Sequence, residues 1–252
     1  MRAVLPILVT VAALACSASG AVEELTFEHD TAGVTILDDR VRPGRDTNWG
    51  GANVISGAWG QMSPVIVDGM FGAGPGQIPP GAAILDAQLR LYAYVNTGGP
   101  GDHTMRAHPL KVDLRPHVGT KDGETETGKM TWTKKSWPDV GWGAGGTGSE
   151  GPVASEDYDA GIFGEGTVTS DCSDCAVGEW VDVDITGIVQ DWQDGVYPNN
   201  GVIIVGVGSN GVYCNSTEQE GVEPMVIVTV PEPATLSLLG AGLALTALRR
   251  KR

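Results

Sequence analysis

Alternating apolar and polar residues are the main pattern in the middle of this chain. In the segment 87–95, AQLRLYAYV, every second residue from Leu89 onward is apolar, and Arg90, Tyr92 and Tyr94 occupy the positions between. The segment 180–185, WVDVDI, repeats the pattern with two aspartates on the polar side. A repeat of two residues places alternate side chains on opposite faces of a β-strand. The pattern therefore predicts antiparallel strands with one face against a core.

Similar runs recur between residues 22 and 230, where Gly, Pro and Asn clusters separate them and helical periodicity is almost absent. The further runs begin at Val34, Asn53, Ser63, Thr104, Met130, Gly201 and Pro224. Many short strands bounded by turn residues are typical of an all-β sandwich. Residues 22–230 are therefore predicted to form one antiparallel β-sandwich domain.

One segment, ITGIVQDWQDG at residues 185–195, has helical spacing instead. Its apolar residues from Ile185 to Trp192 recur at intervals of three and four. Thr186 stands where an N-cap is expected and Gly195 where a helix stops. The pattern predicts a short helix near residues 186–194 that closes one end of the sandwich, with Trp192 packed beneath it.

The stretch from Gly141 to Gly166 differs from the rest of the middle segment. It reads GWGAGGTGSEGPVASEDYDAGIFGEG, which is rich in Gly and acidic residues. Low complexity of this kind is typical of flexible connections. The stretch therefore predicts a mobile surface loop, with no second core on its far side.

The N-terminal end has the pattern of a secretory signal peptide. Arg2 is followed by an apolar segment from Ala3 to Ala15 and then by small residues, CSASGA. A charged start, an apolar centre and a small-residue cleavage zone define such peptides. Residues 1–20 are predicted to be removed, with cleavage near Gly20, and lipidation of Cys16 is the alternative.

The charge balance is strongly acidic. The chain has 16 Lys and Arg against 31 Asp and Glu, a formal net charge of −15. Without Arg2 and the four bases at the C-terminal end, 11 bases remain against the same 31 acids, a formal charge of −20. Such a surface repels phosphate backbones, which argues against nucleic-acid binding. It suits an exported soluble protein.

Three cysteines remain after removal of the signal peptide: Cys172, Cys175 and Cys214. An exported protein meets an oxidising compartment, so one disulfide and one thiol are expected. Three pairings are open. The short loop DCSDC favours Cys172 with Cys175 as a structural bridge over a redox or zinc role.

Four segments follow one another in a recognisable order. They are DTNWGGANVISG from Asp46, PPGAAILDAQLRLYAY from Pro79, MTWT from Met130 and WVDVDITGIVQDWQDGVYPNNGVIIVG from Trp180. This order resembles the DNRLRE domain family. One departure is SPVIVDGMFGAG at residues 63–74, which lacks the basic residues of the corresponding family strand. The resemblance implies a jelly-roll-like fold on an exported protein, polysaccharide binding as in some relatives, and no catalytic residues.

Candidate catalytic residues are sparse. The four histidines, His29, His103, His108 and His117, show neither H-x-H nor H-E-x-x-H spacing. No nucleophile elbow, P-loop or dinucleotide fingerprint is present in the sequence. The chain is therefore predicted not to be an enzyme. The alternative is a secreted polysaccharide lyase or hydrolase that acts on an acidic glycan.

The segment MTWTKKSWPDVGWG offers a candidate carbohydrate site. Trp137, Trp142, Lys134 and Lys135 combine flat aromatic faces with positive charge. Aromatic faces suit stacking on sugar rings, and lysines suit an acidic glycan. The alternative is that these tryptophans cover the core and the edges of loops.

Acidic residues near the same region offer a candidate calcium site. The oxygen ligands would come from Asp157, Asp159, Asp171 and Asp174. Calcium prefers carboxylate and carbonyl oxygens, although these residues do not match an EF-hand loop. Simple solvation of the acids is the alternative, and no cofactor is expected to be required.

The C-terminal end combines three features. Pro231, Glu232 and Pro233 precede an apolar segment from Ala234 to Leu248, which four bases follow. The bases are Arg249, Arg250, Lys251 and Arg252. As a helix the apolar segment would be roughly 22 Å long, shorter than a comfortable membrane span.

This tail, residues 231–252, closely resembles the PEP-CTERM sorting signal. The resemblance implies transient membrane association, with the bases in the cytoplasm, and cleavage near Pro-Glu-Pro by an exosortase. A retained single-span anchor is the alternative. Together the patterns predict an exported, non-enzymatic protein of the cell surface or extracellular matrix that binds or organises polysaccharide.

Overall fold

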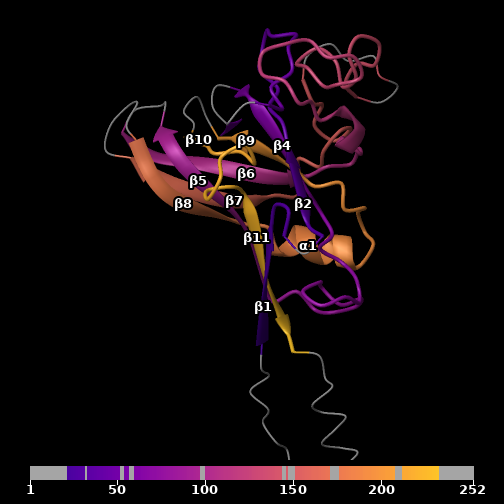
Figure 1. The fold of residues 1–252 in the computed structure, drawn as a ribbon, viewed down its shortest axis with the longest axis vertical. Helices are drawn as coiled ribbons and strands as arrows, with labels where there is room; N and C mark the ends of the chain where they lie inside the picture. The colour runs from indigo at the N-terminus through magenta and orange to yellow at the C-terminus, as the bar shows by residue number, and fades with distance from the viewer. Residues whose placement is uncertain are drawn as a thin grey trace, which may run out of the picture.

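The computed structural model describes residues 22–31, 33–51, 54–56, 60–96, 100–143, 146, 151–170, 176–207 and 212–232. These residues form two antiparallel β-sheets and one α-helix (Figure 1). The two sheets face each other across a shared hydrophobic core. The predicted all-β sandwich with one short helix is confirmed.

The first sheet, called sheet A here, is organised around one long strand. Its strands are β1 (Val22–Glu28), β3 (Ile55–Ser56), β5 (Asp86–Asn96), β8 (Ala176–Asp184), β10 (Val212–Cys214) and β11 (Met225–Pro231). The order is β1-β11-β5-β10-β3, and β8 also pairs with β5. Because both β8 and β11 pair with Gln88, Leu89 and Arg90, they lie on opposite edges of β5.

The second sheet, sheet B, consists of five strands. They are β2 (Thr35–Asp38), β4 (Met62–Asp68), β6 (Gly101–Pro109), β7 (Gly164–Ser170) and β9 (Val202–Gly206), in the order β2-β4-β9-β6-β7. The run predicted from Thr104 forms part of β6, which ends at Pro109. A short 3₁₀ helix, η2 (Arg115–His117), follows this strand.

The core between the sheets follows the alternation read from the sequence. Leu89 and Leu91 of β5 are buried there, as are Val181 and Val183 of β8. The sheets approach most closely where β7 meets β8. A Cβ atom on Gly164 would lie 1.4 Å from the carbonyl oxygen of Asp184, so only glycine fits at this position. The missing side chain allows the two backbones to touch.

The helix α1 spans Thr186–Gln193 and buries Ile188, Val189 and Trp192, as its spacing predicts. Its N-cap is Ile185, so Thr186 is the first helical residue rather than the predicted cap. The Thr186 hydroxyl accepts a hydrogen bond from the Ala87 amide and donates one to Asp184 Oδ1. This hydroxyl ties the start of the helix to β5.

A second hydrophobic cluster covers the outer face of sheet B. It consists of Val41, Ile66, Leu110, Leu114, Val118, Met130, Trp142, Tyr158 and Ile203. Much of it comes from the long connection between β6 and β7, which lies at the upper right of Figure 1. Ile66 and Ile203 belong to strands whose neighbouring residues face the main core, so β4 and β9 are covered on both faces.

Two sequence-based expectations are corrected by this cluster. The MTWT run at Met130 forms no strand; Met130 is buried in the cluster and Trp132 packs against it. The stretch from Gly141 to Gly166 is more than a surface loop, because Trp142 and Tyr158 are buried and its end forms β7. Apolar residues within Gly-rich sequence therefore built a second core.

Candidate binding surface and sorting segment

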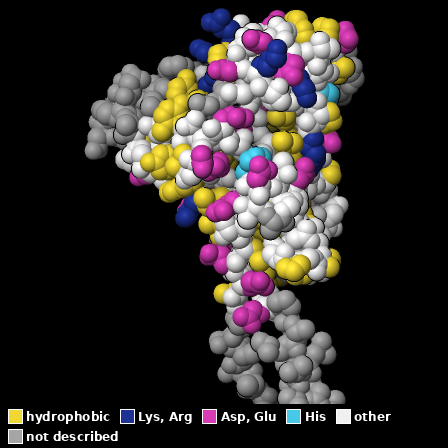
Figure 2. All heavy atoms as spheres, in the orientation of Figure 1, with side chains coloured by type: hydrophobic (Ala, Val, Ile, Leu, Met, Phe, Trp, Pro, Cys, Tyr) yellow, Lys and Arg dark blue, Asp and Glu magenta, His cyan; other side chains and the backbone are white. Residues whose placement is uncertain are grey.

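Four aromatic side chains lie on the outer face of sheet A: Tyr92, Tyr94, Trp180 and Tyr213, called the aromatic row here. Tyr92 and Trp180 are cross-strand partners, and their ring centroids are 5.3 Å apart at an interplanar angle of 76°. Tyr94 stacks on Tyr213 at 6.4 Å. All four are partly exposed, because they alternate with residues that face the core. Hydrophobic side chains gather on the side of the molecule where β5 and β8 lie (Figure 2).

A surface ion pair lies beside one end of the aromatic row. Arg90 Nε and NH2 donate to the two carboxylate oxygens of Asp182 at 2.7 and 2.9 Å. Hydrogen bonding by Arg90 lowers the pKa of Asp182 below its ordinary value. The outer face of sheet A therefore combines aromatic rings with charged hydrogen-bonding groups.

At the other end of the row lies a group that we call the Arg40 cluster: Arg40, Trp49 and Gln61. The Arg40 guanidinium lies 4.6 Å from the centre of the Trp49 ring, and Arg40 is only 7% exposed. Gln61 Nε2 donates to the Tyr213 hydroxyl at 3.5 Å, which joins the cluster to the row. Burial raises the pKa of Tyr94, and the nearby Arg40 charge opposes this.

Three buried polar atoms of the Arg40 cluster have no hydrogen-bond partner. They are Arg40 Nε, Trp49 Nε1 and Gln61 Oε1. Arg40 also makes no ion pair with any residue that the structure describes. Burial lowers the pKa of the Arg40 guanidinium. Buried polar groups are normally hydrogen-bonded, so this concentration is unusual.

A groove of about 550 Å³ runs between β2, η2 and the segment after β10. Its lining includes His29, Asp38, Arg115, Lys129 and Glu218. Burial raises the pKa of Asp38 to about 6, although Thr217 donates to Asp38 Oδ2 through its amide and its hydroxyl. The groove thus contains a carboxyl group that titrates near neutral pH.

Polar side chains on both sides of this groove already form hydrogen bonds within the protein. Arg115 donates to both oxygens of Asp68 and to the carbonyl oxygen of Asn199. The next residue after Asp38, Asp39, accepts hydrogen bonds from Asn48 Nδ2 and from the Gly119 amide. Burial nevertheless raises the pKa of Asp39 to about 7. These contacts fix the positions of the walls.

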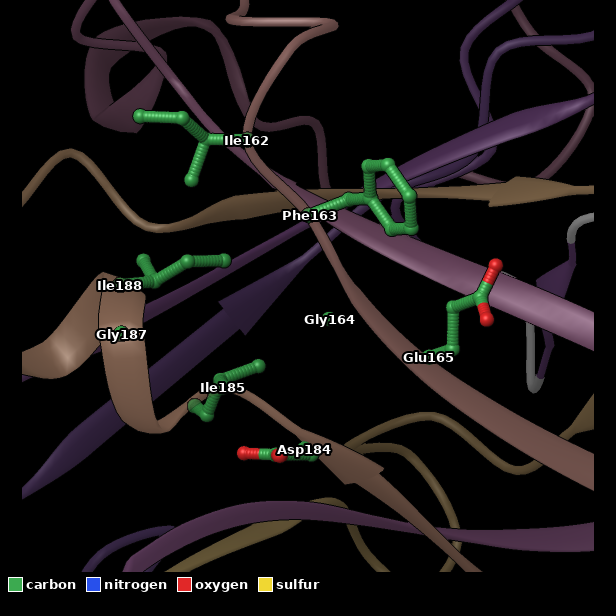
Figure 3. A pocket seen from close by; sticks show the side chains of 8 residues that line it. All are labelled: Ile162, Phe163, Gly164, Glu165, Asp184, Ile185, Gly187 and Ile188. Carbon is green, nitrogen blue, oxygen red and sulfur yellow. The ribbon is translucent and has the colours of Figure 1, made fainter.

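A smaller hollow of about 300 Å³ lies between β7, β8 and the start of α1. Figure 3 shows Ile162, Ile185 and Ile188 around Gly164, with Glu165 and Asp184 at the margins. Glu165 accepts from Arg106 at 2.6 Å, and Asp184 accepts from Thr186. Both carboxylates at this hollow therefore already have partners within the protein.

Strands β1 and β11 form a paired ribbon at the end of sheet A. Val22 lies opposite Pro231, and the register continues to Glu28 opposite Met225. Phe27 and Val230 are buried, whereas Pro231 and Glu232 are exposed. The two strands end side by side at the lower end of the molecule in Figure 1, where acidic side chains predominate in Figure 2.

The end of this ribbon is also the start of a known sorting signal. Residues 229–252 match the PEP-CTERM protein-sorting motif. This motif directs export and localisation to the cell surface or the extracellular space, and it implies processing by an exosortase-type enzyme. No curated protein matches the chain. Residues 229–231 belong to both β11 and the PEP-CTERM motif.

The rest of the PEP-CTERM motif, with Pro233 and the four terminal bases, lies outside the described residues, as do the predicted signal peptide and Cys16. Within the described ranges, no helix is both long enough and apolar enough to cross a membrane. Removal of the tail or its retention as an anchor therefore stays a prediction.

The predicted carbohydrate site around Trp142 is corrected by its burial. Trp142 is fully buried, and its Nε1 donates to the Thr131 carbonyl oxygen at 3.0 Å. Lys135 Nζ lies 3.6 Å from the buried Asp157 carboxylate, and the Lys135 side chain is 16% exposed. Trp142 cannot stack on a ligand, and Lys135 serves an internal ion pair. Trp137 and Lys134 are partly exposed and stay candidates.

The predicted calcium ligands are engaged separately where the structure describes them. Asp157 Oδ2 accepts from the amides of Gly143 and Val153. Asp159 accepts from the Tyr197 hydroxyl and from the Gly161 amide. No group of three or more His, Cys, Asp or Glu residues able to hold a metal occurs within the described part of the chain. Asp171 and Asp174 lie outside it.

Of the three cysteines predicted to remain in the exported protein, the structure describes Cys214. Cys214 is a free thiol that is fully buried, and burial raises its pKa to about 12. Cys214 is therefore the unpaired cysteine among those described, and it is unreactive. The predicted Cys172–Cys175 bridge lies outside the described residues.

Sequence reasoning missed both the aromatic row and the Arg40 cluster as candidate sites. A signal for the row was present, since Tyr92 and Tyr94 occupy the polar side of a predicted strand. The Arg40 cluster had no comparable signal, because its members and Tyr213 are distant in sequence. Only the fold brings them together.

Proposed function

We propose that this protein is a non-enzymatic component of the cell surface or extracellular matrix that binds or organises polysaccharide. The observation that carries the proposal is the aromatic row on the outer face of sheet A. Export and sorting through the PEP-CTERM motif to the cell surface or the extracellular space support the location part of the proposal. An exosortase-type enzyme is its processing partner.

The aromatic row has the chemistry that sugar rings require. Partly exposed aromatic rings offer apolar faces, and tyrosine hydroxyls and the indole N–H offer hydrogen bonds at the ring edges. Tyr92 and Tyr94 are separated by two strand positions, or roughly 7 Å, so their rings follow the strand direction. The resemblance to the DNRLRE domain family, some of whose members bind polysaccharide, supports the same function.

A polysaccharide panel with neutral, uronate-containing and sulfated chains tests this proposal on the full chain. We expect retention by at least one polymer, with affinity reduced roughly tenfold in Trp180→Ala and in Tyr94→Ala. Phe163→Ala is the matched control, because Phe163 is an exposed aromatic residue next to β7 and outside the row. Absence of binding to every polymer, or equal binding by all variants, contradicts the proposal.

A second candidate function is an enzyme that cleaves an acidic glycan. The observation in its favour is the groove in which the Asp38 carboxyl titrates near neutral pH, beside His29 and Glu218. A carboxyl of raised pKa suits general acid–base chemistry. Incubation with uronate polymers, followed by measurement of new reducing or unsaturated ends, tests it. Turnover that is lost in Asp38→Asn would replace the binding function with catalysis.

A further inference from the structure

We propose that the Arg40 cluster binds the acidic group, a carboxylate or a sulfate ester, of a sugar that is held against the aromatic row. This inference rests on the proposed polysaccharide-binding function and names the substrate class: an anionic glycan. The site is formed by Arg40, Trp49 and Gln61, with Tyr213 at its border.

The first argument is the unpaired charge. Arg40 is 7% exposed, its Nε is buried without a hydrogen-bond partner, and no described acid forms an ion pair with it. Burial of an unpaired charge is costly, so buried charges are normally paired. The Trp49 ring, 4.6 Å away, offsets only part of this cost. A bound oxyanion would supply the missing partner.

The short segments next to the neighbouring strands offer no acidic side chain to Arg40. Four of them lie outside the described residues and adjoin β3, β5, β9 and β10 along the chain: 52–53, 57–59, 97–99 and 208–211. They contain neither Asp nor Glu. Asp122 influences the Arg40 pKa but makes no ion pair with it. Neither the acids that the structure describes nor these four segments therefore pair with Arg40.

The second argument is that both donors and acceptors in the cluster are buried without hydrogen-bond partners. Arg40 Nε and Trp49 Nε1 are donors, which suit a carboxylate or sulfate. Gln61 Oε1 is an acceptor, which suits a sugar hydroxyl group. A bare anion would satisfy only the donors. An acidic sugar would satisfy both kinds of atom.

The third argument is position. Gln61 bonds to the Tyr213 hydroxyl, and Tyr213 stacks on Tyr94, so the cluster continues directly into the aromatic row. Sugar rings on the row would thus bring an acidic substituent to Arg40. The net charge of −15 repels anions at long range, so recognition depends on this local, desolvated cation.

The test uses glucuronate, inorganic sulfate and glucose as probes on the full chain, with sodium chloride added to equalise ionic strength. Binding is followed by the shift in thermal midpoint and by calorimetric titration. We expect glucuronate to bind more tightly than sulfate, and glucose to show no detectable binding. Arg40→Gln should weaken glucuronate binding at least tenfold.

Two further variants keep the test decisive. Trp49→Phe retains the ring beside Arg40 and removes only the orphaned donor, so it should fold and weaken glucuronate binding severalfold. Arg90→Gln is the control, because Arg90 lies on the same sheet face but already has Asp182 as its partner. If Arg40→Gln fails to fold, the Trp49→Phe result decides.

Each result bears on one of the two proposals. Equal binding of glucose and glucuronate, or glucuronate binding that Arg40→Gln and Trp49→Phe leave unchanged, overturns the anion site. Retention of neutral and acidic polysaccharides to the same extent supports the proposed function but also overturns the site. Glucuronate binding through Arg40, without retention on any polysaccharide, supports the site and contradicts the proposed function.

Discussion

Val22 and Pro231 lie opposite each other at the open end of the β1–β11 ribbon. The first described residue thereby stands beside the proline that opens the Pro-Glu-Pro sequence. Val230 is the last buried residue before that sequence, and Pro231 and Glu232 are exposed. Cleavage at or after Pro231 would leave every buried position of β11 in place.

The first prediction concerns processing. We expect the surface form of the protein to lack Arg249–Arg252, which mass spectrometry of the native protein measures. Glu232→Ala should leave the thermal midpoint unchanged, because Glu232 is exposed beyond the strand, and should cause the unprocessed form to accumulate. Glu223→Ala, outside the motif, is the control. An intact basic C-terminus on the surface form refutes processing.

The second prediction concerns the ribbon itself. Phe27 is 1% exposed and is paired with Val226 across the ribbon. Phe27→Ala should lower the free energy of unfolding by about 3–5 kcal/mol, through lost burial and the cavity left behind. Thr26→Ala, on the exposed side of the same strand, should change it by less than about 0.5 kcal/mol. Urea denaturation measures both, and equal effects would contradict the register.

The third prediction concerns the contact between the two sheets. Gly164→Ala would place a Cβ atom 1.4 Å from the Asp184 carbonyl oxygen, so β7 must move away from β8. We expect a loss of at least ~3 kcal/mol, or no folded protein. Gly187→Ala is the control, because the space around Gly187 in α1 is open and alanine favours helix by about 0.5–1 kcal/mol. Circular dichroism with thermal melting compares the two variants.

The fourth prediction concerns pH. Burial raises the pKa of Asp38 to about 6 and that of Asp39 to about 7, from an ordinary value of 3.8. The folded state therefore binds more protons than the unfolded state between about pH 4 and pH 7, and stability falls as the pH rises through this window. We expect a loss on the order of 2 kcal/mol for each carboxyl. Urea denaturation at about pH 5 and pH 7 measures it.

Two variants assign this pH dependence to its source. Asp38→Asn removes a titrating group but keeps an oxygen for the Thr217 donors. The free energy of unfolding should therefore fall less steeply with pH in this variant. Asp182→Asn should leave the slope unchanged above about pH 5, because Arg90 lowers the pKa of Asp182. A flat stability profile in the unmodified protein would show that neither carboxyl is protonated on folding.

The fifth prediction concerns metals. We propose that polysaccharide binding requires no metal ion, because the described acids Asp157 and Asp159 are held by separate hydrogen bonds. Treatment with EDTA should leave retention on the polysaccharide panel and the thermal midpoint unchanged. Loss of polysaccharide binding after EDTA treatment, with recovery when calcium is added, would contradict this prediction. Asp171 and Asp174 would then be the candidate calcium ligands.

The sequence was most informative where one face of a strand is buried. The alternation in β5 and β8, and the helical spacing from Ile188 to Trp192, matched the structure closely because burial on one side imposes a period. β7 was missed because Gly164 and Gly166 occupy its inward positions, where apolar side chains would have marked a strand. Close packing of two backbones leaves no hydrophobic signal.

The candidate sites were less predictable because they depend on contacts between distant segments. The sequence predicted that Trp137 and Trp142 share one aromatic surface, but Trp142 is buried in the second core. Spacing in a loop does not state which side chain faces solvent. The hydrogen bond between Gln61 and Tyr213 joins segments that are far apart in the sequence, which no local pattern reveals.

The pairing of β1 with β11 also sets an order of events during export. β11 lies between β1 and β5, so sheet A cannot be completed before β11 has been exported. The PEP-CTERM motif begins within that same strand, so completion of the sheet is tied to the segment that carries the sorting signal. A chain truncated before Met225 would leave β1 without its neighbour and would also lack the motif.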